Sequence, residues 1–220
     1  MRRILIIADS VSSRFGGEAA LPLHYYRVLR SRGDSVWLFC HGRVKDELQA
    51  QFPNDIDRRI FFVDDQPIHR LLSRLGAGLP DRLSYMTTGK LSRCYTQLVQ
   101  RKRAQRLIQA ERIEIVHQPI PVSPKEPSWL FGLGAPVVMG AMNGGMSYPP
   151  AFRAMESASS RVSIAVARLA SNLINRLVPG KRKAALVLVA NERSARALPA
   201  LGGVTVHTLV ENGVDLNLWK

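Results

Sequence analysis

The chain is poor in cysteine and has no long apolar run. Only two of its 220 residues are cysteines, Cys40 and Cys94, and they lie far apart without the spacing of a metal site. Two isolated cysteines favour a reducing compartment over a disulfide scaffold, so we expect a cytoplasmic protein. No stretch approaches the roughly 18 consecutive apolar residues that a membrane-spanning helix needs. The opening "MRRILIIADS" has an apolar run too short for a signal peptide and predicts a first strand.

Acidic and aromatic residues are also scarce. The chain has 17 Asp and Glu against 31 Lys and Arg, a formal net charge of +14, which favours anionic partners such as nucleic acid, acidic phospholipid or phosphorylated substrates. The same charge also serves solubility alone. Aromatic residues make up only 7% of the chain, and we find no zinc spacing or recognition-helix pattern, which argues against a nucleic-acid-binding protein. The hydrolase motifs G-x-S-x-G and H-E-x-x-H are absent as well.

Short apolar runs that alternate with helical segments are what the chain does have. Their continuous hydrophobicity is typical of strands buried on both faces, as in a parallel sheet. Strands that alternate with helices predict an α/β fold, here a Rossmann-like three-layer domain with a mainly parallel sheet. The predicted strands are residues 3–8, 35–40, 59–63, 113–116, 136–140, 184–190 and 204–210.

Three helices are predicted from apolar periodicity. The first follows Gly16 and ends at Gly33, which supplies a left-handed stop. The second spans residues 90–111 and the third residues 160–178. The residues expected to face inward are Leu21, Tyr25, Val28 and Leu29 in the first, Leu91, Tyr95, Leu98, Val99 and Leu107 in the second, and Val162, Val166, Leu169, Leu173 and Leu177 in the third.

The second and third helices carry many arginines outside their apolar stripes, among them Arg161, Arg168 and Arg176. Such helices can rest on an anionic membrane, which would give the protein a peripheral position at the inner face of the membrane. The alternative is two core-packing helices with solvated arginines, and we favour this alternative for both.

A glycine pair, Gly16 and Gly17, separates the first predicted strand from the first predicted helix. A glycine-rich turn before a helix presents free backbone N–H groups and the positive end of the helix dipole to an anion. Without side chains, the turn lets a phosphate approach the backbone closely, and Arg14 lies beside it. Glycine pairs of this kind are equally often only conformational, and the chain has neither G-x-G-x-x-G nor a P-loop.

Two more segments follow predicted strands. His117 comes at the end of the fourth, and the run Asn143, Gly144 and Gly145 follows the fifth. Ligands of open parallel sheets bind outside the carboxyl ends of the strands, so both segments should face the same edge as the glycine turn. A histidine there can donate to a sugar hydroxyl or a phosphate, or act as an acid or base. The alternatives are a histidine bonded to backbone and an ordinary tight turn.

Five segments, in this order and spacing, resemble the N-terminal half of a family 4 glycosyltransferase: "GGEAALPLHYYRVLRSRGDSVWLF", "VHQPIPVSP", "MNGGMSYPP", "VANERSARAL" and "ENGVD". The resemblance implies the GT-B architecture, two Rossmann-like domains that face each other across a cleft. Residues 1–210 would be the N-terminal, acceptor-side domain. Residues 211–220 would begin the interdomain linker, and the second, donor-binding domain is absent from the sequence.

The family's site residues carry over to matching positions. By resemblance, Gly16 and Gly17, with Arg14 beside them, would contact the donor diphosphate. His117 would be a catalytic residue near the transferred sugar, and the loop of residues 143–145 would line the acceptor side of the cleft. By resemblance, transfer with retention is expected without a metal or a cofactor other than the nucleotide-sugar. The leaving phosphate would accept the acceptor's proton, and neighbouring donors would stabilise its developing charge.

The expected function is therefore the transfer of a hexosyl group from a nucleotide-sugar to a sugar or a lipid-linked acceptor, in the synthesis of a polysaccharide or a glycolipid. Little activity is expected from this chain without a donor-binding domain. One alternative is a single-domain accessory subunit that docks on a separate donor-binding chain through Leu216, Leu218 and Trp219. A basic nucleic-acid-binding protein is the other alternative, and the composition disfavours it.

Overall fold

Seven strands form the centre of the domain in the computed structural model, which describes residues 1–145 and 158–210, the side chains of 82, 86 and 158–167 excepted. The strands are β1 (Arg3–Ile7), β2 (Ser35–His41), β3 (Ile60–Val63), β4 (Ile115–Gln118), β5 (Val137–Met142), β6 (Leu186–Val189) and β7 (Val206–Thr208). They pair in parallel in the order β3-β2-β1-β4-β5-β6-β7. The predicted α/β, Rossmann-like fold is confirmed.

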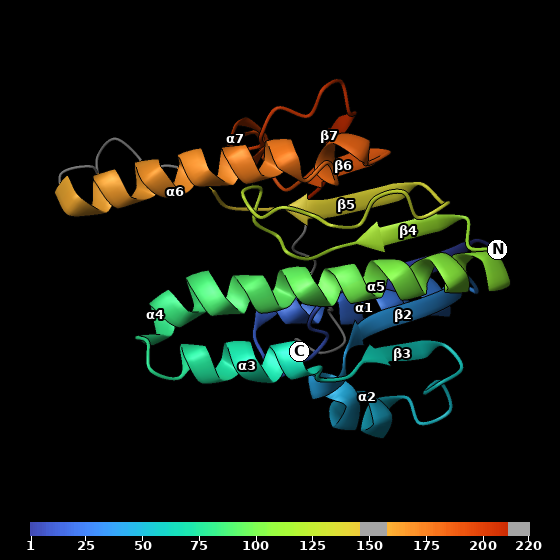
Figure 1. Ribbon diagram of the computed structural model, residues 1–220. Helices are drawn as coiled ribbons and strands as arrows, with labels where there is room; N and C mark the ends of the chain where they lie inside the picture. The colour runs from blue at the N-terminus through green and yellow to red at the C-terminus, as the bar shows by residue number, and fades with distance from the viewer. Residues whose placement is uncertain (146–157, 211–220) are drawn as a thin grey trace, which may run out of the picture.

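Helices cover both faces of this sheet (Figure 1). They are α1 (Gly17–Ser31), α2 (Lys45–Gln51), α3 (Pro67–Gly76), α4 (Asp81–Ser84), α5 (Lys90–Ala110), α6 (Ala158–Leu177) and α7 (Glu192–Arg196), with the short turns η1 (Gly42–Val44), η2 (Tyr85–Gly89) and η4 (Lys181–Lys183). In the described part of the chain, no helix is both long and apolar enough to cross a bilayer.

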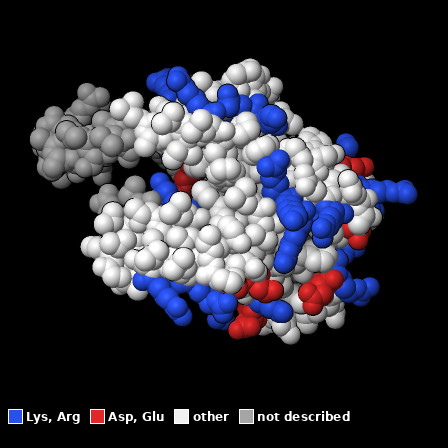
Figure 2. Space-filling view, viewed as in Figure 1, with Lys and Arg blue, Asp and Glu red and all other residues white. Residues whose placement is uncertain are grey.

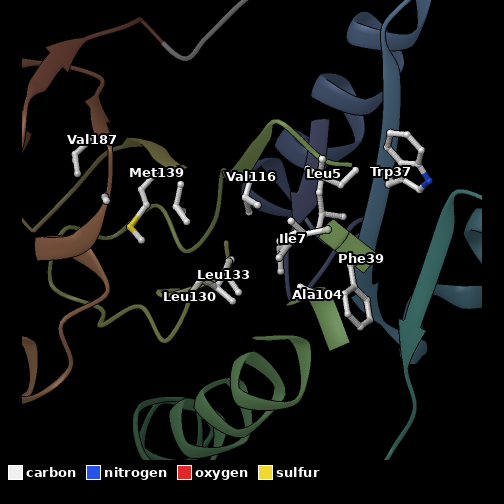
Figure 3. Packing of buried hydrophobic residues seen from close by; sticks show 14 of the residues in the cluster. Leu5, Ile7, Trp37, Phe39, Ala104, Val116, Leu130, Leu133, Met139 and Val187 are labelled. Carbon is white, nitrogen blue, oxygen red and sulfur yellow. The ribbon is translucent and has the colours of Figure 1, made fainter. Parts of the chain in front are cut away.

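Alternation along the strands divides the core into two clusters. Leu5 and Ile7 of β1 pack with Ala104 of α5, whereas Ile4 and Ile6 pack with Leu23 of α1. Successive residues of a strand point to opposite faces, so each apolar strand contributes to both clusters. Figure 3 shows the first cluster, in which residues from β1, β2, β4, β5 and β6 lie together with Ala104, Leu130 and Leu133.

The boundaries of the seven predicted strands differ from the structure by up to two residues at either end, and β4 shows the shift most plainly. It begins at Ile115 instead of residue 113 because the C-terminal turn of α5 extends further: the amide of Ile113 donates to the carbonyl of Ile108 over 3.0 Å. His117 therefore lies inside β4 and not at its end. Gly33 stops α1 as predicted, with φ +86° and its amide bonded to the carbonyl of Arg30.

The predicted buried faces of α1 and α5 are partly wrong. Val28 is exposed, and α1 instead buries Tyr26, whose hydroxyl donates to Asp55 over 3.0 Å and so has a partner inside the protein. Leu91 and Leu98 of α5 are exposed, and mostly polar residues occupy the buried side of this helix. The α5 residues that are buried are Thr96, Gln97, Gln100, Ala104 and Ile108.

The prediction that the apolar stripe of α6 packs into the core is also wrong. Leu169, Leu173 and Leu177 are exposed, while Asn175 of the same helix is buried. Val162, Val166 and Arg161 lie outside the described side chains. Residues 211–220, with Leu216, Leu218 and Trp219, lie outside the described residues as well, so the accessory-subunit surface stays a prediction.

Candidate functional site

A cavity of about 450 Å³ lies at the carboxyl ends of β1 and β4. The chain turns from β1 toward β2 on one side of the sheet and from β4 toward β5 on the other, so the order of the strands reverses between β1 and β4. In open α/β sheets ligands bind at this switch point, and the volume is in the range of small-molecule sites. Its walls include Asp9, Phe15, Glu18, Tyr85, Arg93 and Glu126.

Two ion pairs border the cavity. Arg43 Nη2 lies 2.8 Å from Asp9 Oδ2, and Arg93 Nη2 lies 2.9 Å from Glu126 Oε1. In each pair one polar atom is left over: Asp9 Oδ1 and Arg93 Nε are buried and have no hydrogen-bond partner among the described residues. A buried polar atom without a partner is costly, so both atoms favour a ligand that supplies a donor to the aspartate and an acceptor to the arginine.

The charges of these walls nearly cancel. Three carboxylates, those of Asp9, Glu18 and Glu126, face two guanidinium groups, those of Arg43 and Arg93. The strong positive charge of the chain is therefore not concentrated here. A neutral ligand with many hydroxyl groups suits alternating donors and acceptors better than a polyanion does.

Two aromatic side chains stand at the mouth of the cavity. Phe15 is 62% exposed and Tyr85 is 58% exposed, although both line the cavity. The guanidinium of Arg93 lies 4.4 Å from the centre of the Tyr85 ring. Tyr85 begins η2, a π-helical turn, and such turns often occur at functional sites. The rings offer flat apolar faces against which the C–H face of a sugar can stack.

The glycine turn is placed as predicted, at the beginning of α1 beside the cavity. Gly16 precedes the helix with φ +88° and, as the N-cap residue, has no side chain that could cap the first turn. A Cβ atom added to Gly16 or Gly17 would meet no described atom within 4 Å, so there is open space beside the Cα atoms of this turn. Arg14 is exposed, and its amide donates to Ser12 Oγ over 2.9 Å.

His117 lies away from the cavity and the glycine turn. It is only 8% exposed, Nε2 is 2.7 Å from the carbonyl oxygen of Gly140, and the ring packs edge-to-face on Tyr25 at 4.6 Å. Tyr25 follows Gly17 by eight residues, which is about 12 Å along the helix. Burial lowers the pKa of His117. The histidine is thus a neutral donor to backbone, as in the alternative interpretation, and does not line the cavity.

The loop of residues 143–145 joins three elements at the same edge of the sheet. The amide of Asn143 donates to the carbonyl of Val122 over 2.8 Å, and the amide of Val122 donates to Glu18 Oε1 over 3.1 Å. Ser194 Oγ of α7 lies 3.3 Å from Asn143 Oδ1 and from the amide of Gly144. The loop and the glycine turn therefore meet through Val122, as expected for segments that follow parallel strands.

A second cluster, His41, Asp65 and His69, has side-chain ligand atoms within 4.8 Å of one another. Nδ1 of His41 accepts the amide of Arg43, and Nδ1 of His69 accepts the amide of Gln66 over 3.0 Å. Each Nε2 therefore carries the proton. The Nε2 of His41 faces Asp65, and that of His69 lies 3.1 Å from Thr96 Oγ1. A metal would have to displace these bonds, so the donor set fits helix caps and not a metal centre.

Comparisons with known proteins identify no family. No protein-family model matches the chain, and a search of curated proteins finds no match. The likeness to family 4 glycosyltransferases rests on the sequence segments alone.

Sequence reasoning missed the side chains of the cavity. Asp9 directly follows the first predicted strand, a position where ligand-binding residues are common, and this was a usable signal. Arg93 and Glu126 lie in a long basic helix and in a loop, 33 residues apart, and only the fold makes them a pair.

Proposed function

We propose that the chain is the acceptor-side half of a retaining glycosyltransferase, which moves a hexosyl group from a nucleotide-sugar to an acceptor in polysaccharide or glycolipid synthesis. The proposal starts from the family resemblance. The observation that carries it further is the cavity at the switch point, where Asp9 Oδ1 and Arg93 Nε have no hydrogen-bond partner among the described residues, beside the N-terminus of α1.

The acceptor occupies the cavity in this proposal. Asp9 Oδ1 accepts from one acceptor hydroxyl, Arg93 Nε donates to another, and the exposed rings of Phe15 and Tyr85 stack on the sugar. The near balance of charge in the walls supports a neutral acceptor sugar at this point.

The donor diphosphate binds at the glycine turn. The amides of Gly16 and Gly17 and the positive end of α1 stabilise its charge, with Arg14 nearby. In the transfer the bond between the sugar C1 and the phosphate oxygen breaks. The acceptor oxygen bonds to C1 on the same face, and its proton passes to the leaving phosphate. No metal or further cofactor takes part.

His117 has a positioning role in this proposal instead of the catalytic role that the resemblance implies. Its hydrogen bond to Gly140 orients β5 directly before the loop of residues 143–145. The loop in turn holds Val122 and Glu18 beside the glycine turn.

The donor side is tested by replacing Gly17 with alanine. The added methyl group meets no protein atom, so the domain should stay folded, but it would occupy the place of the phosphate. We expect inorganic pyrophosphate and UDP to shift the backbone amide resonances of residues 16–18 in the unmodified chain, and the Gly17→Ala variant to bind at least about tenfold more weakly. Gly78→Ala, a glycine with equally empty surroundings, is the matched control. Equal binding by both variants would remove the phosphate site from the glycine turn.

The acceptor side is tested by saturation-transfer NMR with the methyl glycosides of common hexoses. We expect the signal of the best glycoside to fall about threefold or more in Tyr85→Ser, because stacking on an aromatic ring contributes on the order of 1 kcal/mol. Leu91→Ser removes a side chain that is also 58% exposed but lies outside the cavity, and it should bind like the unmodified chain. Absence of binding by every glycoside, or the same loss in both variants, would contradict an acceptor site here.

A further inference from the structure

The outer face of α6 carries a row of exposed leucines. Leu169, Leu173 and Leu177 follow one another at intervals of four residues, so they lie on one side of the helix, and they are 70%, 58% and 74% exposed. Ile174 beside them is 43% exposed. Single exposed apolar residues are ordinary, but a contiguous row of this kind marks an interaction surface.

The helix cannot turn this row inward without breaking hydrogen bonds. On its opposite side, Ser171 Oγ and Asn175 Nδ2 donate to the carbonyl of Lys125 over 2.5 Å and 3.1 Å. Asn175 Nδ2 also lies 2.8 Å from the carbonyl of Ser171. The polar side chains of α6 thus hold the helix to the loop after β4, and its leucines face outward as a consequence.

The sequence around α6 is basic. Between Glu156 and Glu192 it contains no acidic residue and six basic ones, Arg161, Arg168, Arg176, Lys181, Arg182 and Lys183, of which Lys181 is buried. Figure 2 shows lysine and arginine side chains beside α6 along the top of the molecule. A second copy of the chain packed on this face would bring arginines against arginines, which disfavours a dimer. An anionic surface has the complementary charge.

We propose that α6 docks on an anionic phospholipid membrane. The leucine row enters the boundary between headgroups and acyl chains, and the neighbouring arginines bind lipid phosphates. Figure 1 shows α6 extending past the ends of β4 and β5, on the side of the molecule where the strands end and the cavity lies. If the proposed function holds as well, the cavity receives an acceptor that is itself anchored in this membrane.

Vesicle flotation with the 220-residue chain tests the docking. We expect about tenfold more protein on vesicles of equal parts phosphatidylcholine and phosphatidylglycerol than on phosphatidylcholine alone, and a decrease of this binding in high salt. The triple variant L169S/L173S/L177S should lose at least about tenfold of the binding. Its far-ultraviolet circular dichroism in solution should match that of the unmodified chain, because the three side chains are exposed.

The matched control is Leu71→Ser with Leu75→Ser on α3. These two leucines are similarly exposed, 55% and 60%, and this variant should bind vesicles like the unmodified chain. The proposal is overturned by an absence of binding, by equal binding to neutral and anionic vesicles, or by an equal loss in the α3 control. A dimer in sedimentation velocity that the triple variant abolishes, without vesicle binding, would assign the leucine row to a second copy. Vesicle binding without glycoside binding would leave the docking intact and reject the acceptor site alone.

Discussion

Replacing Gly140 with alanine is expected to destabilise the domain by about 3–5 kcal/mol. Gly140 lies within β5, near the middle of the sheet, where the register with β6 shifts between Met139 and Met142. Its φ is +102°, a conformation that side chains disfavour. An added Cβ atom would lie 2.3 Å from the carbonyl oxygen of Leu188 and 2.7 Å from the amide nitrogen of Met142. Both are backbone atoms, one in β6 and one in β5 itself, so relief would require the backbone of both strands to shift.

This loss is a large part of the 5–15 kcal/mol that stabilises a typical domain. Urea unfolding followed by circular dichroism measures it. Gly134→Ala is the matched control, because Gly134 also has a positive φ, +90°, but empty surroundings, so it should cost only the backbone strain of about 1 kcal/mol. If both variants unfold at the same urea concentration, the sheet absorbs the methyl group and the predicted clash is wrong.

Acid should destabilise the domain at a pH where most folded proteins are still stable. Three buried histidines, His41, His69 and His117, have pKa values that burial lowers below the usual 6.5. Unfolding exposes them and restores the ordinary pKa, so the unfolded chain binds more protons. The contribution of these histidines to stability is therefore complete above about pH 6.5 and decreases as the pH falls below it, toward the lowered pKa values of the folded state.

Each histidine that takes up a proton on unfolding contributes up to about 1.4 kcal/mol per pH unit to this decrease. Urea unfolding at a series of pH values between about 5 and 8 measures the slope. His117→Gln keeps a side-chain donor for Gly140 and should reduce the proton uptake by one. A stability independent of pH over this range would contradict neutral, buried histidines.

Lys181 makes the stability of the domain depend on pH above pH 7 as well. It is 2% exposed, its Nζ lies 2.5 Å from the carbonyl oxygen of Pro124, and burial lowers its pKa to about 7. Since an exposed lysine in the unfolded chain holds its proton to a much higher pH, stability should rise further above pH 7. Lys181→Met should remove this rise while the dependence below pH 6.5 persists.

Local sequence patterns predicted the seven strands, the helices α1, α5 and α6, and the turn before α1. Seven apolar runs became seven strands because a run of β-branched and aromatic residues favours the extended chain wherever it is buried. Gly16 and Gly33 border α1 in the positive-φ conformations that glycine adopts easily. Parallel strands end at one edge, and for this reason the glycine turn and the loop of residues 143–145 come close together.

The tertiary structure decided which side of a helix is buried and which side chains meet at the cavity. Periodicity identifies an apolar stripe on α6, but the hydrogen bonds of Ser171 and Asn175 to a distant loop turn that stripe outward. His117 lies beside Tyr25, away from the glycine turn, because a shift of two residues in β4 places it within the sheet. Such contacts join residues far apart in the chain, and no local periodicity encodes them.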